Sequence, residues 1–116
     1  MKKVYVASPV RPVLDHSIDE YSAYAQISWF ASQGCKAVKE MGHIPVSPIL
    51  AFDGVYDEFT ERDAIDKACE ALLLSCDYIH VVHTPYNKES KGIARELELA
   101  KKHGIETLYI MPKERE

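Results

Sequence analysis

The sequence lacks the glycine patterns that hold nucleotide phosphates: neither GxGxxG nor GxxxxGK[ST] occurs in its 116 residues. It has no basic run, and its net charge of −4 at pH 7 argues against a nucleic-acid partner held by phosphate neutralisation. No apolar run approaches the roughly 20 residues of a membrane span, and we expect no signal peptide and no membrane partner. Standard dinucleotide, P-loop, nucleic-acid and membrane proteins are therefore excluded.

Cysteine is scarce, and histidine is not arranged to hold a metal. The three cysteines are an odd number without CxxC spacing, so they are typical of buried thiols in a reducing cytosol. His80 and His83 lie three residues apart on an expected strand, where side chains point to opposite faces. We therefore expect a cytoplasmic protein without metal or cofactor.

The motifs of two well-known α/β classes are also missing. No Ser-His-Asp arrangement or GxSxG elbow is visible, and a phospho-receiver domain would need acidic residues just after the first strand. Ser8 and Pro9 stand there instead. The composition, with 47% hydrophobic and 28% charged residues, is that of an ordinary globular protein, and its length predicts a single domain over residues 1–116.

Four short apolar runs separated by helical patterns predict an alternating α/β chain. The expected strands are Lys3–Ala7, His43–Ser47, Tyr78–Val82 and Glu106–Met111. The expected helices run from about Ser17 or Asp19 to Glu40, from the cap Thr60 to before Asp77, and from Ser90 to Gly104. Residues 8–17 are expected to form a long connection, and residues 48–59 a second one of the kind that often covers an active site.

This alternation predicts a three-layer α/β/α sandwich with a parallel four-stranded sheet in the flavodoxin-like strand order 2-1-3-4. In such sheets ligands bind at the carboxyl ends of the strands, where the strand order reverses. That point lies between the first and third strands. It is expected to bring the loop 8–11 and the loop 84–90 together at the start of the last helix.

The start of that last helix carries the most informative residues. Ser90 is placed to cap the first turn, whose free N–H groups attract a phosphate or carboxylate, and Gly92 leaves room for a ligand to approach. Glu96 has only apolar or glycine neighbours at helical spacing, namely Gly92, Ile93, Leu99 and Ala100. An inward, unpaired carboxylate is a candidate for chemistry. The alternative is that Glu96 reaches water or meets a distant Arg or Lys.

Two further charged residues are candidates with ordinary alternatives. Arg11 follows the first strand and suits a phosphate or carboxylate at the switch point, or else forms a surface salt bridge. Asp77, before the third strand, is a candidate for ligand binding, although a carboxylate at a helix-to-strand turn is commonplace. The aromatic residues of the long first helix suit core packing, a partner helix or a base-stacking wall.

Four segments together resemble a known family. They are a Tyr-bearing first strand ending in Ser-Pro-x-Arg, the strand Cys-Asp-Tyr-Ile-His-Val-Val, the helix start Ser-x-Gly-x-x-x-Glu, and the closing Gly-Ile-Glu-Thr-Leu-Tyr-Ile. This order resembles the nucleoside 2-deoxyribosyltransferase-like superfamily, and within it the small bacterial and phage branch of the domain-of-unknown-function group 4406 and its relatives.

The resemblance implies roles for individual residues. Glu96 would be the nucleophile that attacks the anomeric carbon of a nucleoside or its 5′-monophosphate, and Tyr5 would orient it. Ser90 and Arg11 would hold the 5′-phosphate, with Ser8 nearby. The same analogy implies a homodimer or larger homo-oligomer. The family's catalytic aspartate has no match in Lys67–Glu70, where Asp66 or Glu70 would substitute only in a shifted register.

Three functions therefore remain open at the level of sequence. The first is an N-glycosidase or deoxyribosyltransferase that uses Glu96. The second is a module that binds a nucleotide or sugar phosphate in the same cleft without cleaving it, which the missing aspartate favours. The third is a structural partner protein whose aromatic residues mediate association, which requires a closed and empty cleft.

Overall fold

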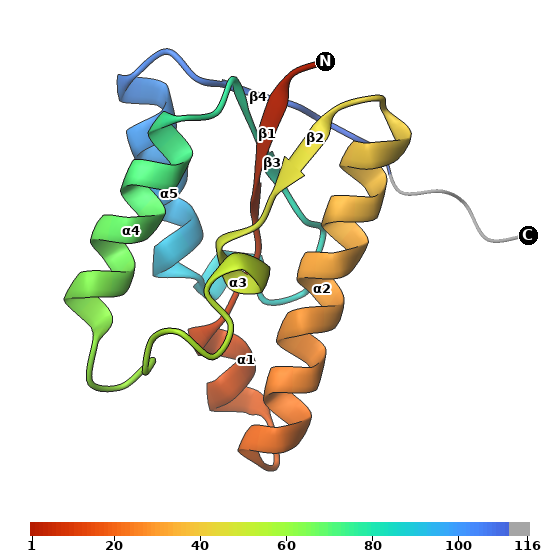
Figure 1. Ribbon diagram of the computed structural model, residues 1–116. Helices are drawn as coiled ribbons and strands as arrows, with labels where there is room; N and C mark the ends of the chain where they lie inside the picture. The colour runs from red at the N-terminus through yellow and green to blue at the C-terminus, as the bar shows by residue number, and fades with distance from the viewer. Residues whose placement is uncertain (112–116) are drawn as a thin grey trace, which may run out of the picture.

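The computed structural model describes residues 1–111, and its core is a parallel sheet of four short strands; Figure 1 shows the arrangement of the sheet and helices. The strands are β1 (Lys3–Ala7), β2 (Ile44–Val46), β3 (Tyr78–Val81) and β4 (Glu106–Thr107). They pair in the order β2-β1-β3-β4, and each neighbouring pair is parallel. The predicted flavodoxin-like α/β sandwich is confirmed. Pro45 lies in β2 at the edge of the sheet, where a missing N–H donor is tolerated.

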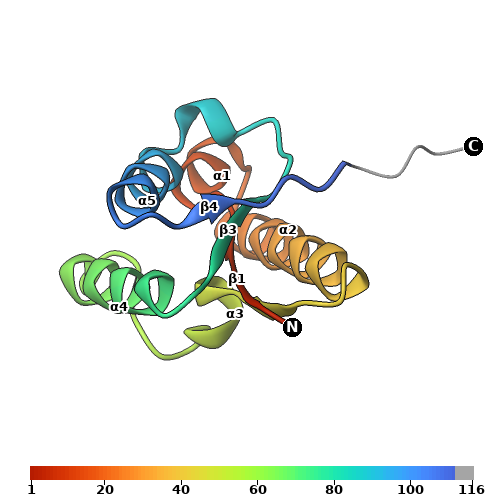
Figure 2. The same cartoon turned by 90° about the horizontal axis from the view of Figure 1, so that it is seen from above.

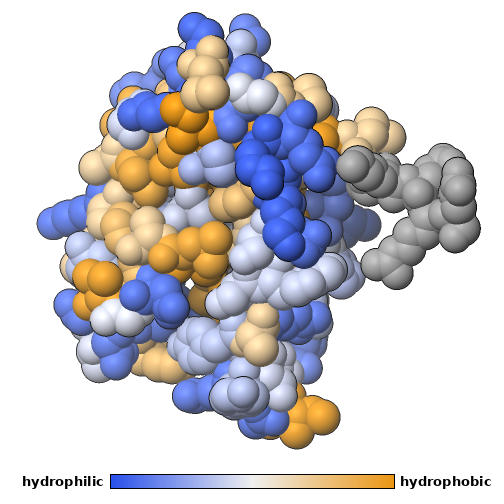
Figure 3. Space-filling view, turned by 45° about the vertical axis from the view of Figure 1, so that its right-hand side comes forward, coloured by the Kyte–Doolittle hydropathy of each residue, from blue (hydrophilic) through white to orange (hydrophobic). Residues whose placement is uncertain are grey.

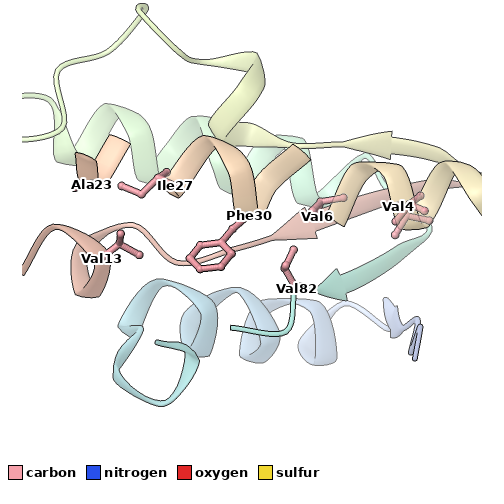
Figure 4. Packing of buried hydrophobic residues seen from close by; sticks show 8 residues of the cluster. Val4, Val6, Val13, Ala23, Ile27, Phe30 and Val82 are labelled. Carbon is pink, nitrogen blue, oxygen red and sulfur yellow. The ribbon is translucent and has the colours of Figure 1, made fainter. Parts of the chain in front are cut away.

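Helices cover both faces of the sheet (Figure 2). They are α1 (Arg11–His16), α2 (Glu20–Glu40), α3 (Pro48–Ala51), α4 (Arg62–Leu74), the 3₁₀ helix η1 (Asn87–Glu89) and α5 (Lys91–Lys102). Val4 and Val6 of β1 pack against α1 and α2, whereas Tyr5 and Ala7 pack against α4 and α5. This alternation follows from the period of two in a strand, and it sends Tyr5 to the face that α5 covers. Figure 4 shows the hydrophobic cluster that contains Val4 and Val6, which lies between α2 and the strands.

Several local predictions hold because each depends on a single residue. Ser90 caps α5 by accepting a hydrogen bond from the N–H of Ile93 at 3.2 Å, and Asp19 caps α2 by accepting one from the N–H of Ser22 at 2.7 Å. Gly42 and Gly104 have φ angles of +83° and +71°, the left-handed conformation that ends α2 and α5.

Other boundaries differ from the prediction. The connection 8–17 contains α1, whose early proline Pro12 needs no N–H partner in a first turn, and the connection 48–59, named the flap from here on, contains α3. Thr60 does not cap α4; the Asp57 carboxylate accepts the N–H groups of Phe59 and Thr60 instead. β4 ends at Thr107 rather than Met111. The N–H of Leu108 still donates to the carbonyl of Ile79 at 2.7 Å, but the carbonyl of Leu108 faces the imidazole Nδ1 of His80 at 3.0 Å instead of a backbone N–H.

Hydrophobic residues are exposed at several separate places. Ile18, Tyr21 and Trp29 are exposed before and along α2. On the face shown in Figure 3, hydrophobic residues are dispersed among hydrophilic ones. Within residues 1–111, no helix combines the length and apolar character needed to cross a membrane.

Gly34 sets how closely α2 approaches the sheet, and its replacement by alanine is expected to destabilise the protein. A Cβ at this position would lie 2.4 Å from Cγ2 of Val82 and 2.7 Å from Cγ1 of Val6. Both are stiff β-branched side chains, so overpacking is expected to cost about 1–3 kcal/mol despite the better helix propensity of alanine. Urea denaturation measures the change in the free energy of unfolding.

The matched control is Gly92→Ala in α5, where the nearest atom to a new Cβ is Ser90 Oγ at 3.8 Å. This change is expected to leave stability unchanged or raise it by up to about 1 kcal/mol. A Gly34→Ala protein as stable as the wild type would contradict the close approach of α2 to Val6 and Val82.

Candidate functional site

A cleft of about 940 Å³ opens at the carboxyl ends of β1 and β3. Its walls come from α1, the start of α2, the flap, α4 and the first turns of α5. Ser8 follows β1 and Ser90 begins α5, and both line this cleft, as expected for the point where the strand order reverses. The predicted site residues Arg11, Gly92 and Glu96 line it as well.

Glu96 lies partly buried in the cleft and is held by Tyr5. The Tyr5 hydroxyl donates a hydrogen bond to Oε2 of Glu96, from a position 91 residues earlier in the sequence. Burial raises the pKa of Glu96 to about 7, and this rise is partly offset by the Tyr5 hydrogen bond and by the positive charges of Arg62 and Arg95. Glu96 forms no ion pair with any residue between 1 and 111. The carboxyl group therefore exchanges its proton near neutral pH, which is the range useful for catalysis.

Tyr5 is fully buried and remains a hydrogen-bond donor at any physiological pH. Burial and the neighbouring Glu96 carboxylate raise the pKa of Tyr5 far above its ordinary value. Cys69, on α4, neighbours Tyr5 and also lines the cleft, and burial raises the pKa of its thiol to about 11. Sequence analysis missed Cys69 as a site residue. Its place among the apolar positions of α4 was the only signal, and that signal does not distinguish a core thiol from one that faces a cleft.

Ser8, Ser90 and Gly92 form a polar patch beside Glu96. The Ser8 hydroxyl is buried and has no hydrogen-bond partner among residues 1–111. Ser90 satisfies the N–H of Ile93, whereas the first two N–H groups of α5, those of Lys91 and Gly92, have no acceptor within the helix. This combination of free donors at a helix N-terminus favours an anionic group.

Arg11 forms a salt bridge, and its binding of a phosphate or carboxylate stays a prediction. Its guanidinium lines the cleft, lies 5.0 Å from the ring centroid of Phe59, and has Nη2 3.8 Å from Oε1 of Glu58. Arg11 therefore forms a salt bridge to Glu58 of the flap, and this salt bridge lies in the cleft rather than on the outer surface. Its side chain is 48% exposed and open to a ligand.

Asp77 is not brought to the cleft. It precedes β3, so it lies at the amino ends of the strands, opposite the edge where Ser8 and Ser90 meet. Its carboxylate accepts a hydrogen bond from the backbone N–H of Lys3 at 2.9 Å. This contact ties the start of β3 to the start of β1, which is a structural role.

Four charged residues of the cleft were not predicted as site residues. Glu58, Arg62, Asp66 and Arg95 form linked ion pairs across it. The signal available in the sequence was the spacing of Glu58, Arg62 and Asp66 at intervals of four. Asp66, considered as a substitute for a missing aspartate, is bound by two arginines. Residues 1–111 contain no group of three His, Cys, Asp or Glu side chains able to hold a metal ion.

Comparison with known families corrects the resemblance found in the sequence. The model of a domain of unknown function, DUF7768, matches residues 2–110. The chain belongs to this family. A search of the curated proteins found no match for this DUF7768 chain.

The assignment to the nucleoside 2-deoxyribosyltransferase-like superfamily, or to the 4406 group, was therefore wrong. Its motifs were short, and each describes a feature common to parallel α/β sheets. These features are a polar turn after the first strand, a serine N-cap and an inward helix side chain. The roles that it implied for Glu96, Tyr5, Ser90 and Arg11 in this DUF7768 domain now depend on geometry alone.

Proposed function

We propose that the cleft is the active site of an N-glycosidase or deoxyribosyltransferase that acts on nucleosides or nucleoside 5′-monophosphates through Glu96. The observation that carries this proposal is the partly buried carboxyl group of Glu96, held by Tyr5 in a cleft and titrating near pH 7. A volume of about 940 Å³ accommodates a ligand of nucleotide size.

The proposed reaction has two steps. A carboxylate oxygen of Glu96 attacks the anomeric carbon; the new C–O ester bond forms as the C–N glycosidic bond breaks, and the base leaves with the bonding electrons and takes a proton from water. Water or a second base then attacks the same carbon and releases Glu96. The Tyr5 O–H group favours the ionised carboxylate that the first step needs. The proposed reaction uses no metal or cofactor.

The surrounding residues support a polar, phosphorylated ligand. The orphan hydroxyl of Ser8, the free N–H groups at the start of α5 and the guanidinium of Arg11 are donors on the walls of the same cleft. Tyr24 of α2 and Phe59 of the flap also line it and offer aromatic faces to a base. We propose that the sugar phosphate binds to these donors and that the base packs against Tyr24 and the part of the Phe59 ring that Arg11 leaves free.

One observation favours a second candidate, a nucleotide-binding or sugar-phosphate-binding module without catalysis. Besides Glu96, the partly buried carboxyl groups lining the cleft are Glu58 and Asp66, and arginines pair with both. Neither is free to protonate a leaving base. The purely structural alternative needs a closed cleft, and the open one argues against it.

The proposal extends to assembly and location. Exposed Tyr21 and Trp29 on α2 support a homodimer or larger homo-oligomer, and the three free cysteines, Cys35, Cys69 and Cys76, support the reducing cytoplasm.

Chromatographic detection of free base tests the proposed reaction. The protein is incubated with a panel of nucleosides and 5′-monophosphates, each with and without a second base as acceptor. Base release without acceptor identifies a hydrolase, and release that depends on acceptor identifies a transferase. If calorimetry detects binding of a nucleotide and no free base is released from it, the binding module is the correct function and the enzyme is not.

A further inference from the structure

Five alternating charges cross the cleft from α1 to α5. Oε1 of Glu58, in the flap, contacts both Nη2 of Arg11 at 3.8 Å and Nη1 of Arg62. The other terminal nitrogen of Arg62 lies 2.9 Å from Oδ1 of Asp66, and Oδ2 of Asp66 lies 2.7 Å from Nη1 of Arg95. All five side chains line the cleft. This set, called the charge chain here, thus joins α1, the flap, α4 and α5.

The charge chain holds one more positive charge than negative charge. Its three guanidinium groups face two carboxylates, and the neighbouring Glu96 carries a full negative charge only above about pH 7. Each guanidinium has five N–H donors, and the ion pairs use only some of them. The unused guanidinium N–H groups are therefore available to an additional anion at this place, although carboxylates outnumber basic groups in the lining of the whole cleft.

Glu58 is the more enclosed of the two carboxylates in the charge chain. Its side chain is 14% exposed and that of Asp66 is 27% exposed, whereas those of Arg11 and Arg62 are 48% and 43% exposed. One oxygen atom of Glu58 lies between two guanidinium groups that come from different helices, which is the arrangement that a phosphate or carboxylate oxygen of a ligand would adopt.

We infer that Arg11 and Arg62 form a binding site for the anionic group of a ligand, and that the Glu58 carboxylate competes with that group for the same two guanidiniums. The ligand class is a phosphate ester or a carboxylate. The inference rests on the proposal that the cleft binds an anionic ligand, but it does not depend on the chemistry of Glu96. Nothing in the sequence reasoning assigned a ligand to Arg62.

The flap is built so that Glu58 can leave without unwinding its surroundings. The Asp57 carboxylate accepts the N–H groups of Phe59 and Thr60 at 2.8 and 3.0 Å, and the Asp57 N–H is bonded to Oε1 of Glu61 at 3.0 Å. These bonds hold the turn into α4 independently of the Glu58 side chain. Displacement of the Glu58 carboxylate by an anion therefore leaves these three hydrogen bonds in place.

Titration with inorganic phosphate tests the inference in Glu58→Gln. The Nε–Hε signals of arginine are followed in ¹H–¹⁵N spectra while phosphate is added, with sodium chloride at equal ionic strength as the reference. Removing the competing carboxylate is expected to lower the Kd for phosphate about three- to tenfold, the range set by the ion pair that is lost. Arg62→Met is expected to raise the Kd about tenfold or more.

The matched control is Asp63→Asn, which removes one negative charge from the same region but outside the cleft. Its Kd is expected to stay within about twofold of the wild type, because exposed charges are screened by solvent and salt. The inference would be overturned if Glu58→Gln bound phosphate no more tightly than the wild type. It would also be overturned if Glu58→Gln and Asp63→Asn bound phosphate with the same Kd. So would phosphate-dependent shifts confined to Lys91 and Gly92.

The outcome is independent of turnover. The titration gives the same answer whether or not base release is detected, so failure of the anion site and failure of the glycosidase proposal are distinguishable. If Arg62→Met does not fold, the comparison of Glu58→Gln with Asp63→Asn still decides the question.

Discussion

Replacing Glu96 by glutamine is expected to reduce base release by a factor of about a thousand or more, because the amide cannot attack the anomeric carbon or exchange a proton. The fold is expected to persist, since glutamine has nearly the same volume and its amide oxygen still accepts the hydrogen bond from Tyr5. Release is measured by chromatography on the most active substrate of the panel, and folding by circular dichroism.

The control for this substitution is Glu98→Gln on the same helix. Glu98 is exposed and is not among the residues that line the cleft. The rate of base release by Glu98→Gln is therefore expected to stay within about twofold of the wild-type rate. Rapid quenching followed by mass spectrometry would add the decisive detail. A glycosyl adduct on the wild-type protein, absent from Glu96→Gln, is expected for a nucleophilic carboxylate, and full activity of Glu96→Gln would remove Glu96 from the mechanism.

The second large effect is on stability as a function of pH. The pKa of Glu96 is raised from 4.5 to about 7 in the folded state, so the folded protein binds this proton more tightly than the unfolded chain. The stabilising contribution of protonated Glu96 to the free energy of unfolding is fully present below pH 4.5 and is lost as the pH rises through 7. At 1.36 kcal/mol per pKa unit, the wild type is expected to lose about 3 kcal/mol over this range relative to Glu96→Gln.

Urea denaturation of both proteins at a series of pH values measures this difference. Other carboxyl groups contribute equally to the two proteins, so the difference between their free energies of unfolding isolates Glu96. Tyr5→Phe removes a hydrogen bond that lowers the pKa of Glu96. The pKa of Glu96 is therefore expected to rise further in this variant, so that its loss of stability continues to a higher pH than in the wild type. A difference that does not change between pH 4.5 and pH 8 would show that Glu96 is solvated.

Local signals account for most of the fold that the sequence predicted. The strands were found from runs of β-branched and aromatic residues, and helix ends from single residues such as Ser90 and Gly42. The short helices α1 and α3 were missed because four to six residues carry no helical period. β4 was predicted too long because the apolar run after Thr107 looks like a strand, whereas its length depends on the partner β3.

The candidate site was predictable only where one element determines the direction of a side chain. Glu96 was placed correctly in the cleft because helical spacing puts it on the inward face. Asp77 could have been placed at the other edge from strand direction alone, since a residue before a parallel strand lies at its amino end. The charge chain could not be found in this way, because Arg11, Glu58 and Arg95 come from three separate segments whose relative positions depend on tertiary packing.

The contact between Tyr5 and Glu96 has a practical consequence for finding the natural ligand. Because it joins residues 91 positions apart, the cleft exists only when β1 and α5 are both docked, and global unfolding destroys it. Any compound that binds there must raise the melting temperature, by an amount that corresponds to about 2.7 kcal/mol at a hundred times its Kd. A thermal-shift screen of a metabolite library can therefore identify ligands of every chemical class, without assuming a reaction in advance.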